Sequence, residues 1–307
     1  MKVLITGATG LIGRALCGSL SEQSHTVVGL SRSPETKRGL GAAELHKWDP
    51  RSGQFPTRAL AGVDAVVHLA GEPIVARRWS EEQKKRIRDS RVLTTRTLVE
   101  AFRALDHRPR VFVCGSAVGF YGDRGDESLD EAAPAGKGFL SEVCQEWESE
   151  AAGVSELGMR VVEVRTGVVL SADGGALPKM LAPFKLGLGG RLGSGKQWFP
   201  WIHIQDIVGI FSHAILTSSL EGPVNGVAPE AATNAEFTNQ LARVLHRPAF
   251  LPVPELALRV LMGEMADALL GSQRVIPAAA LASKYEFHYQ SLTPALEHLL
   301  GNAKTSD

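Results

Sequence analysis

The sequence is poor in the features that mark several classes of protein. Its 307 residues carry no net charge, because 33 lysine and arginine residues balance 33 acidic ones. A neutral chain has no overall electrostatic attraction for nucleic acid or an anionic membrane, so we expect neither as a partner. No apolar run approaches the roughly 18 residues that a membrane-spanning helix needs.

Cysteine is scarce as well. Cys17, Cys114 and Cys144 are odd in number and far apart, which fits neither a disulfide framework nor a zinc-binding pattern. We therefore expect no metal site, and we interpret the three thiols as small buried apolar side chains. The chain opens on a strand-like run, without a basic start and an apolar signal core, so we expect a cytoplasmic protein.

Glycine is abundant, and three glycines near the N-terminus are the most informative. Gly7-x-x-Gly10-x-x-Gly13 follows the strand-like run Val3–Thr6 and opens a helix at about Leu11. Glycine permits a tight turn and a close approach of the backbone to a pyrophosphate, and the helix N-terminus offers free N–H groups to that anion. The pattern predicts a dinucleotide site; the alternative is a purely structural turn between strand and helix.

Strand-like and helix-like segments alternate along the first half of the chain. The expected strands are Val3–Thr6, Thr26–Ser31, Ala65–Leu69, Val111–Cys114 and Arg160–Arg165. The expected helices are Leu11–Ser21, Glu81–Ala104, about Gly138–Ala152 and one that ends near Leu216. Strands rich in Val, Ile and Leu without alternation are buried on both faces. We therefore expect an α/β fold, a Rossmann-type doubly wound parallel sheet covered by helices.

The composition changes after the last of these strands. Glycine, proline and lysine become frequent in residues 171–200, which is typical of loops and short helices. We expect residues 1–165 and 201–228 to form the nucleotide-binding domain. Residues 166–200 and 229–301 would form a smaller, mainly helical C-terminal substrate domain.

The end of the second expected strand distinguishes between two cofactors. A site selective for NAD usually has an Asp or Glu here for the ribose 2′-hydroxyl, whereas this chain has Ser31 and Arg32. A guanidinium can hold a phosphate through paired hydrogen bonds and can stack on adenine. We therefore predict NADP(H) as the cofactor; the alternative for Arg32 is a solvated surface arginine.

Further motifs bring a family resemblance into view. His68-Leu-Ala-Gly-Glu72, Ser116-Ala-Val-Gly-Phe-Tyr121 and Arg165-Thr-Gly-Val-Val-Leu170 each come at a strand end. With the glycine turn, they resemble the extended short-chain dehydrogenase/reductases of the NAD-dependent epimerase/dehydratase family. A second set resembles the YfcH-type, or SulA-like, epimerase family proteins, which have their own C-terminal domain. This set comprises Arg78-Trp79, Ser90-Arg91, Pro183–Gly190, Gly193–Asp206, Leu258–Glu264 and Gln273–Pro277.

The resemblance implies which residues hold the cofactor. It places the pyrophosphate on the turn and the start of the helix, at Gly7, Thr9, Gly10, Leu11, Ile12 and Gly13. Leu69, Ala70, Gly71 and Glu72 would line the path between the two riboses. Arg91 would reach a phosphate or ribose, and Arg165 and Gly167 would lie near the nicotinamide amide.

The catalytic pair that the resemblance implies is missing. Related enzymes use Tyr-x-x-x-Lys, in which the tyrosine transfers a proton and the lysine lowers its pKa and holds the nicotinamide ribose. Phe139 and Val143 stand at these two positions, and neither can transfer a proton. The chain has three tyrosines, Tyr121, Tyr285 and Tyr289, and none of them begins such a motif.

Two interpretations of this loss remain open. In one, the chain is an atypical oxidoreductase or epimerase whose acid–base groups are found among Ser116, Tyr121, Glu142, Glu72 and His203. The alternatives for Glu142 and His203 are a solvated helix residue and a fixed structural imidazole. In the other interpretation, the chain binds NADP(H) without catalysis, as a sensor or partner-binding module.

The substrate is expected to be a polar small molecule. The segment Gly187–Lys196 contains Arg191 and Lys196, which favours an anionic or polar ligand such as a sugar nucleotide or another polar carbonyl or alcohol. The alternative is a solvated loop without a ligand. The sequence leaves the oligomeric state open between monomer and dimer.

Overall fold

The computed structural model is built on a seven-stranded parallel sheet, and it describes residues 1–33, 40–75 and 77–301. The strands stand in the order β11-β7-β5-β4-β1-β2-β3. Their bounds are β1 (Lys2–Thr6), β2 (Thr26–Ser31), β3 (Glu44–Lys47), β4 (Ala65–His68), β5 (Val111–Ala117), β7 (Arg160–Thr166) and β11 (Gly222–Gly226). All neighbouring pairs are parallel, which confirms the predicted fold class.

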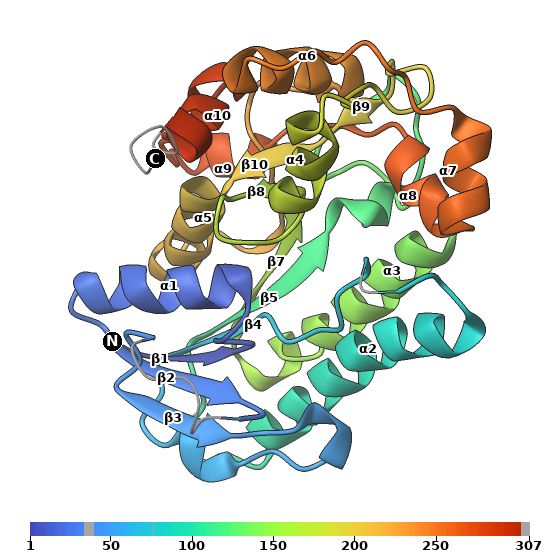
Figure 1. The fold of residues 1–307 in the computed structure, drawn as a ribbon. Coiled ribbons are helices and arrows are strands. Elements are labelled where there is room, and N and C mark those ends of the chain that lie inside the picture. Colours follow the sequence, from blue (N-terminus) through green and yellow to red (C-terminus); the bar gives the residue numbers. More distant parts are fainter. Residues whose placement is uncertain (34–39, 76, 302–307) are drawn as a thin grey trace.

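Helices cover both faces of this sheet (Figure 1). α1 (Leu11–Glu22) and α5 (Ile204–Leu216) lie on one face, and α2 (Glu81–Arg103) and α3 (Phe139–Ala152) lie on the other. Because successive side chains of a strand point to opposite faces, β1 contributes to both cores. Val3 and Ile5 are fully buried under α1 and α5, and Leu4 is fully buried on the side of α2 and α3.

Two strands of the sheet lie outside the sequence prediction. β3 is a half-exposed edge strand, whereas apolar runs mark strands that are buried on both faces. β11 contains two glycines and a proline, and its backbone is held by parallel pairing with β7. Pairing with a neighbour, rather than strand propensity, therefore defines these two edges.

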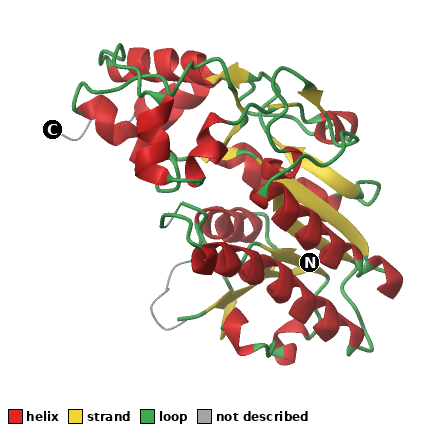
Figure 2. Cartoon of the chain, turned by 90° about the vertical axis from the view of Figure 1, so that its right-hand side faces the viewer, coloured by secondary structure: helices red, strands yellow, loops and turns green. Residues whose placement is uncertain are grey.

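The remaining elements form a second lobe, here termed the C-terminal lobe, above the sheet in Figure 1 (see also Figure 2). Its helices are α4 (Leu177–Lys185), α6 (Asn234–Leu245), α7 (Glu255–Met262), α8 (Met265–Leu270), α9 (Ala278–Ala282) and α10 (Leu292–Gly301). Short strand pairs connect it: β8 (Val168–Leu170) with β10 (Trp201–His203), β9 (Trp198–Phe199) with β12 (Ala232–Thr233), and β6 (Ser128–Leu129) with β13 (Arg274–Val275). Trp201, Phe184 and Leu241 are buried in its core.

Two further findings bear on the sequence analysis. Cys17, Cys114 and Cys144 are all buried with free thiols, as expected, and burial raises the pKa of Cys144 to about 11. Within the part of the chain that the structure describes, no helix combines the length and the apolar character needed to cross a membrane.

Candidate functional site

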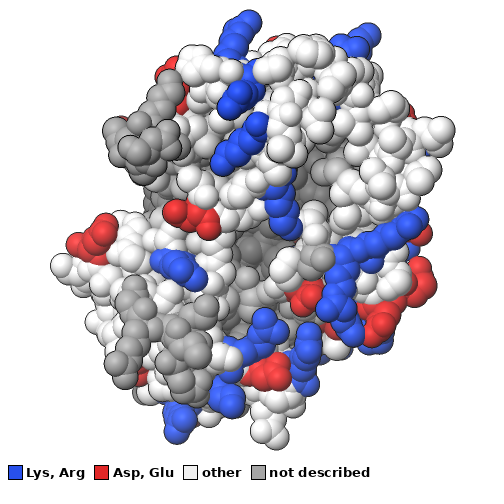
Figure 3. Space-filling model, in the orientation of Figure 1, with Lys and Arg blue, Asp and Glu red and all other residues white. Residues whose placement is uncertain are grey.

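A cavity of about 810 Å³ lies where the strand order reverses. From β1 the chain continues to β2 and β3 on one side, and then to β4 and β5 on the other. Ligands of doubly wound folds bind in this crevice, at the carboxyl ends of the strands. The loops after β1, β2 and β4 line the cavity, together with the segment after β3 and one side of α2. In Figure 3, which has the orientation of Figure 1, the surface is hollowed near its centre.

Gly7 lines the cavity at a position where the fold leaves no room for a side chain. Its φ is +68°, and a Cβ atom would lie 2.7 Å from the backbone carbon of Leu69. A Cβ on Gly13 would lie 2.3 Å from the carbonyl oxygen of Gly7, so Gly13 lets α1 start directly against the turn. The loops after β1 and β4 are therefore in backbone contact, and Gly7 and Gly10 present bare backbone to the cavity.

A buried hydrogen-bond pair fixes the two loops together. The hydroxyl of Thr6 accepts from the backbone N–H groups of Leu69 and Ala70, both at 3.2 Å, and lies 2.6 Å from Nδ1 of His68. Burial, together with the nearby charge of Arg91, lowers the pKa of His68 to about 3. The imidazole is therefore neutral, and its Nδ1 accepts a hydrogen bond from the hydroxyl of Thr6.

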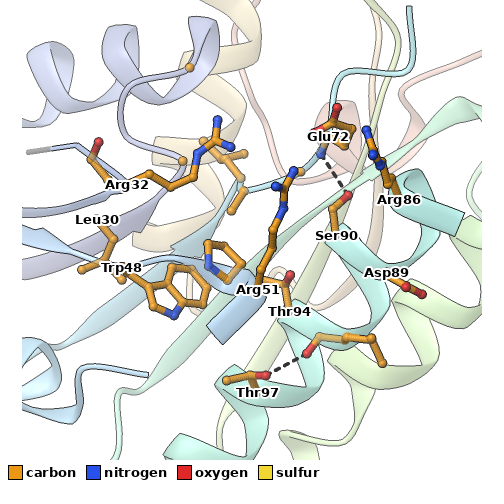
Figure 4. Close-up of a pocket in the computed structure, with 18 of the residues that line it drawn as sticks. Leu30, Arg32, Trp48, Arg51, Glu72, Arg86, Asp89, Ser90, Thr94 and Thr97 are labelled. Atoms are coloured by element: carbon orange, nitrogen blue, oxygen red, sulfur yellow. Dashed lines mark hydrogen bonds between the residues drawn. The ribbon is translucent and has the colours of Figure 1, made fainter. Parts of the chain in front are cut away.

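The end of the cavity beside β2 is rich in guanidinium groups. Ser31 and Arg32, at the carboxyl end of β2, line it as expected, and Trp48 and Arg51 join them from the segment after β3. Figure 4 shows Arg32 and Arg51 extending toward the same central space. Sequence reasoning missed Trp48 and Arg51 because it did not recognise β3, the strand that delivers them.

The opposite wall is formed by α2, which holds the loop after β4. Ser90 accepts the backbone N–H of Glu72 at 2.9 Å (Figure 4), and Arg91 donates to the carbonyl oxygen of the same residue at 3.1 Å. Burial lowers the pKa of Arg91. Ser90 lines the cavity while Arg91 stands behind the loop, so Arg91 supports the loop from outside the lining. Arg86, which sequence reasoning also missed, lines the cavity from the preceding turn of α2.

The cofactor-binding residues expected from the sequence divide into two groups. The residues that line the cavity are Gly7, Thr9, Gly10, Ser31, Arg32, Leu69, Ala70, Gly71 and Glu72. The residues outside its lining are Leu11, Ile12, Gly13, Arg91, Arg165 and Gly167. The segment Gly187–Lys196 is likewise outside the lining.

Arg165 is placed in a buried polar cluster between the sheet and α3. Its guanidinium makes two parallel hydrogen bonds of 2.9 Å to the carboxylate of Glu148 and a third, also of 2.9 Å, to the hydroxyl of Tyr121. Ser116 donates to the same carboxylate at 2.6 Å. The ring of Phe120 covers the guanidinium, with its centroid 3.5 Å from Cζ. Charge, hydrogen bonding and ring contact thus hold this cluster as one unit.

Three of the five expected acid–base groups, Ser116, Tyr121 and His203, are engaged in structural hydrogen bonds. Ser116 and Tyr121 belong to the cluster around Arg165, and the Tyr121 hydroxyl also contacts Asn225 at 2.8 Å. Tyr121 is fully buried, and burial raises its pKa. Glu142 is exposed in the first turn of α3.

The third of these groups, His203, joins the sheet to the C-terminal lobe. Its Nδ1 accepts the backbone N–H of Gln205 at the start of α5, so Nε2 carries the proton and donates to His298 of α10 at 3.2 Å. Burial and the neighbouring His298 lower the pKa of His203 to about 4. Asp206 continues the connection by accepting the backbone N–H groups of His288 and Tyr289.

The position of the missing tyrosine is occupied by packed side chains. Phe139 makes an edge contact with Trp79, at 5.2 Å between ring centroids, and the ammonium of Lys84 lies 5.7 Å from the Phe139 ring. Lys84 also pairs with Glu264 of the C-terminal lobe. Val143, in place of the lysine, is buried. Trp79 and the first turn of α2 therefore lie against this position, and Lys84 brings an ammonium group to it.

Comparison with known proteins decides the family. Residues 3–225 match the model of the NAD dependent epimerase/dehydratase family. The chain belongs to this family. Residues 253–299 match a domain of unknown function, DUF1731, which confirms the expectation of a separate C-terminal domain type.

Individual family members are similar over nearly the whole chain. Epimerase family protein Mb2239 of Mycobacterium bovis is 43% identical over 295 residues, which is 96% of each protein. The crystal structure of human epimerase family protein SDR39U1 with NADPH has a TM-score of 0.87 and 39% identity, and the match covers 98% of this chain and 100% of the human one. A nucleoside-diphosphate sugar epimerase from Corynebacterium glutamicum has a TM-score of 0.80 and 38% identity over 98% of this chain and 58% of that chain.

Proposed function

We propose that this family member binds NADP(H) in the cavity between β1, β2, β4 and α2. The observation that supports this most directly is the pair of guanidinium groups, Arg32 and Arg51, beside a strand end without a carboxylate. They would hold the 2′-phosphate, while Gly7 and Gly10 would hold the pyrophosphate. The similarity to a human protein crystallised with NADPH agrees with this assignment.

The Arg32→Asp variant tests the cofactor assignment. We expect it to weaken NADPH binding by about 10- to 100-fold, because it removes a charge-assisted hydrogen bond and adds a repelling carboxylate. NADH, which has no 2′-phosphate, should be affected far less. Fluorescence or calorimetric titration of both cofactors measures the difference.

The control is Arg58→Asp, which makes the same change at an exposed arginine outside the cavity lining. It should leave both affinities unchanged. Equal losses for NADPH and NADH in Arg32→Asp, or a wild type that prefers NADH, would show that the 2′-phosphate assignment is wrong.

We further propose that the reaction is an oxidoreduction or a sugar-nucleotide epimerisation without the usual Tyr–Lys pair. The bound cofactor would give or take a hydride, and a side chain of the chain would move the proton. The candidates for that proton transfer are Lys84, which lies against Phe139, and Glu142, on the first turn of α3.

We also propose that the chain divides into a nucleotide-binding domain (1–165 and 201–228) and a substrate domain (166–200 and 229–301).

A turnover assay distinguishes this proposal from the alternative, a non-catalytic NADP(H)-binding module. The structural hydrogen bonds of Ser116, Tyr121 and His203 favour that alternative. Wild-type protein should oxidise NADPH with at least one carbonyl compound of a panel, or convert at least one nucleoside-diphosphate sugar into its epimer without net consumption of the cofactor. Lys84→Met should lower that rate by about 100-fold, in the range lost when a general acid–base group is removed. The exposed neighbour Lys85 provides the control variant, Lys85→Met. Tight NADPH binding without any turnover would support the module instead.

A further inference from the structure

Large apolar side chains project into solvent on one side of the C-terminal lobe. The side chains are Leu186, Leu188, Phe250, Leu256, Val260 and Leu261, and we term this set the α7 patch. Four of them are 72–75% exposed. Single exposed leucines are ordinary on protein surfaces, whereas a contiguous group marks an interaction site.

Backbone hydrogen bonds bring the three segments of the α7 patch together. The N–H of Val253 donates to the carbonyl of Arg191, and the N–H of Gly193 donates to the carbonyl of Val253, both at 2.9 Å. The strand-like stretches 189–193 and 251–253 therefore run side by side, with Leu188 and Phe250 just before them. α7 begins two residues after this pairing, so its exposed residues continue the same surface.

The two chain segments that carry the patch, 177–196 and 243–262, are rich in cations, although the protein as a whole is neutral. Residues 177–196 and 243–262 together contain seven lysines and arginines and one acidic residue, Glu255, which is paired with Arg259. The other six cations are exposed, and none has a carboxylate within ion-pair distance in the described chain: Lys179, Lys185, Arg191, Lys196, Arg243 and Arg247. In Figure 3, the surface over α7 is largely free of charge, and Lys and Arg side chains stand on the lobe beside it.

We propose that the α7 patch docks the protein on an anionic lipid surface. The cations are attracted to lipid headgroups, while the projecting leucines and Phe250 enter the boundary with the acyl chains. A second copy of the chain fits less well, because a two-fold contact through this face would bring two sets of the same cations together. Since no described helix can cross a bilayer, the protein would lie on the membrane surface.

Vesicle co-sedimentation with the full chain tests this docking. Vesicles of one third phosphatidylserine in phosphatidylcholine should retain the wild type, and retention should fall as ionic strength rises. Vesicles of pure phosphatidylcholine should retain it at least about tenfold less. The double variant Leu256→Glu/Val260→Glu should bind at least about tenfold more weakly to the anionic vesicles, because two apolar contacts are lost and two repelling charges are added.

The matched control is Leu216→Glu/Leu281→Glu, in which two leucines that are about half exposed, at 52% and 51%, lie on α5 and α9 outside the patch. It should bind the vesicles like the wild type. Lys185→Glu/Arg247→Glu should also lose binding, and it leaves the apolar residues in place. Equal binding to both vesicle types, or no binding at low salt, would overturn the proposal. So would a stable dimer in sedimentation equilibrium that Leu256→Glu/Val260→Glu converts to monomer, or specific retention by an acidic protein without vesicle binding.

Discussion

The Glu148→Ala variant is expected to lose about 3–5 kcal/mol of unfolding free energy, because it leaves a buried guanidinium without its ion-pair partner. Arg165 is 4% exposed, and two of its hydrogen bonds go to the Glu148 carboxylate. Removing that partner leaves a buried charge with no other carboxylate within ion-pair distance in the described chain, and it also deprives Ser116 of its acceptor. Chemical denaturation followed by circular dichroism measures the change.

Glu150→Ala is the matched control for this prediction. Glu150 stands two residues later on α3 and pairs with Arg96 at the surface. Since an exposed ion pair contributes at most about 1 kcal/mol, this variant should stay close to the wild type. Losses of similar size in the two variants would mean that the Arg165 cluster is not the buried charge network described above.

The Gly7→Ala variant is expected to lose about 2–4 kcal/mol of stability, from the left-handed backbone and the clash with the loop after β4. The added Cβ would meet the carbonyl carbon and oxygen of Leu69, both at 2.7 Å, and backbone atoms cannot turn aside as a side chain can. Because the loops after β1 and β4 line the cavity, their separation should also weaken NADPH binding by at least about tenfold.

The control is Gly18→Ala, which makes the same change in α1 at a glycine with nothing within 4 Å of the added atom. Alanine favours helix over glycine by about 1 kcal/mol, so this variant should be as stable as the wild type or more so. A Gly7→Ala protein with unchanged stability and unchanged NADPH affinity would contradict the close contact between the two loops.

The sequence predicted the central fold well because the relevant signals are local. Buried parallel strands appear as short runs of Val, Ile and Leu, and the glycine turn after β1 needs only its own spacing. β3 and β11 lacked such runs, since both are edge strands, and the loss of β3 concealed Trp48 and Arg51 at the cavity. When a strand is not recognised in the sequence, the residues that follow it cannot be assigned to the cavity.

Side-chain roles were harder to predict than the elements that carry them. Ser116 and Arg165 follow motifs at strand ends, yet in the structure their side chains meet Glu148 in the interior. His203 faces α10, nearly a hundred residues later in the chain. Spacing along the chain places a residue on an element, whereas its partner depends on which distant segment packs against it.

By itself, the sequence determined the doubly wound sheet, the glycine turn at its crevice and the absence of the Tyr–Lys pair, because each depends on residue type at a fixed local spacing. Only the tertiary structure brought Arg51 beside Arg32, packed Phe139 against Trp79 and Lys84, and exposed a set of large apolar side chains on the C-terminal lobe. These arrangements join segments far apart in sequence, and long-range packing and pairing decide which segments meet.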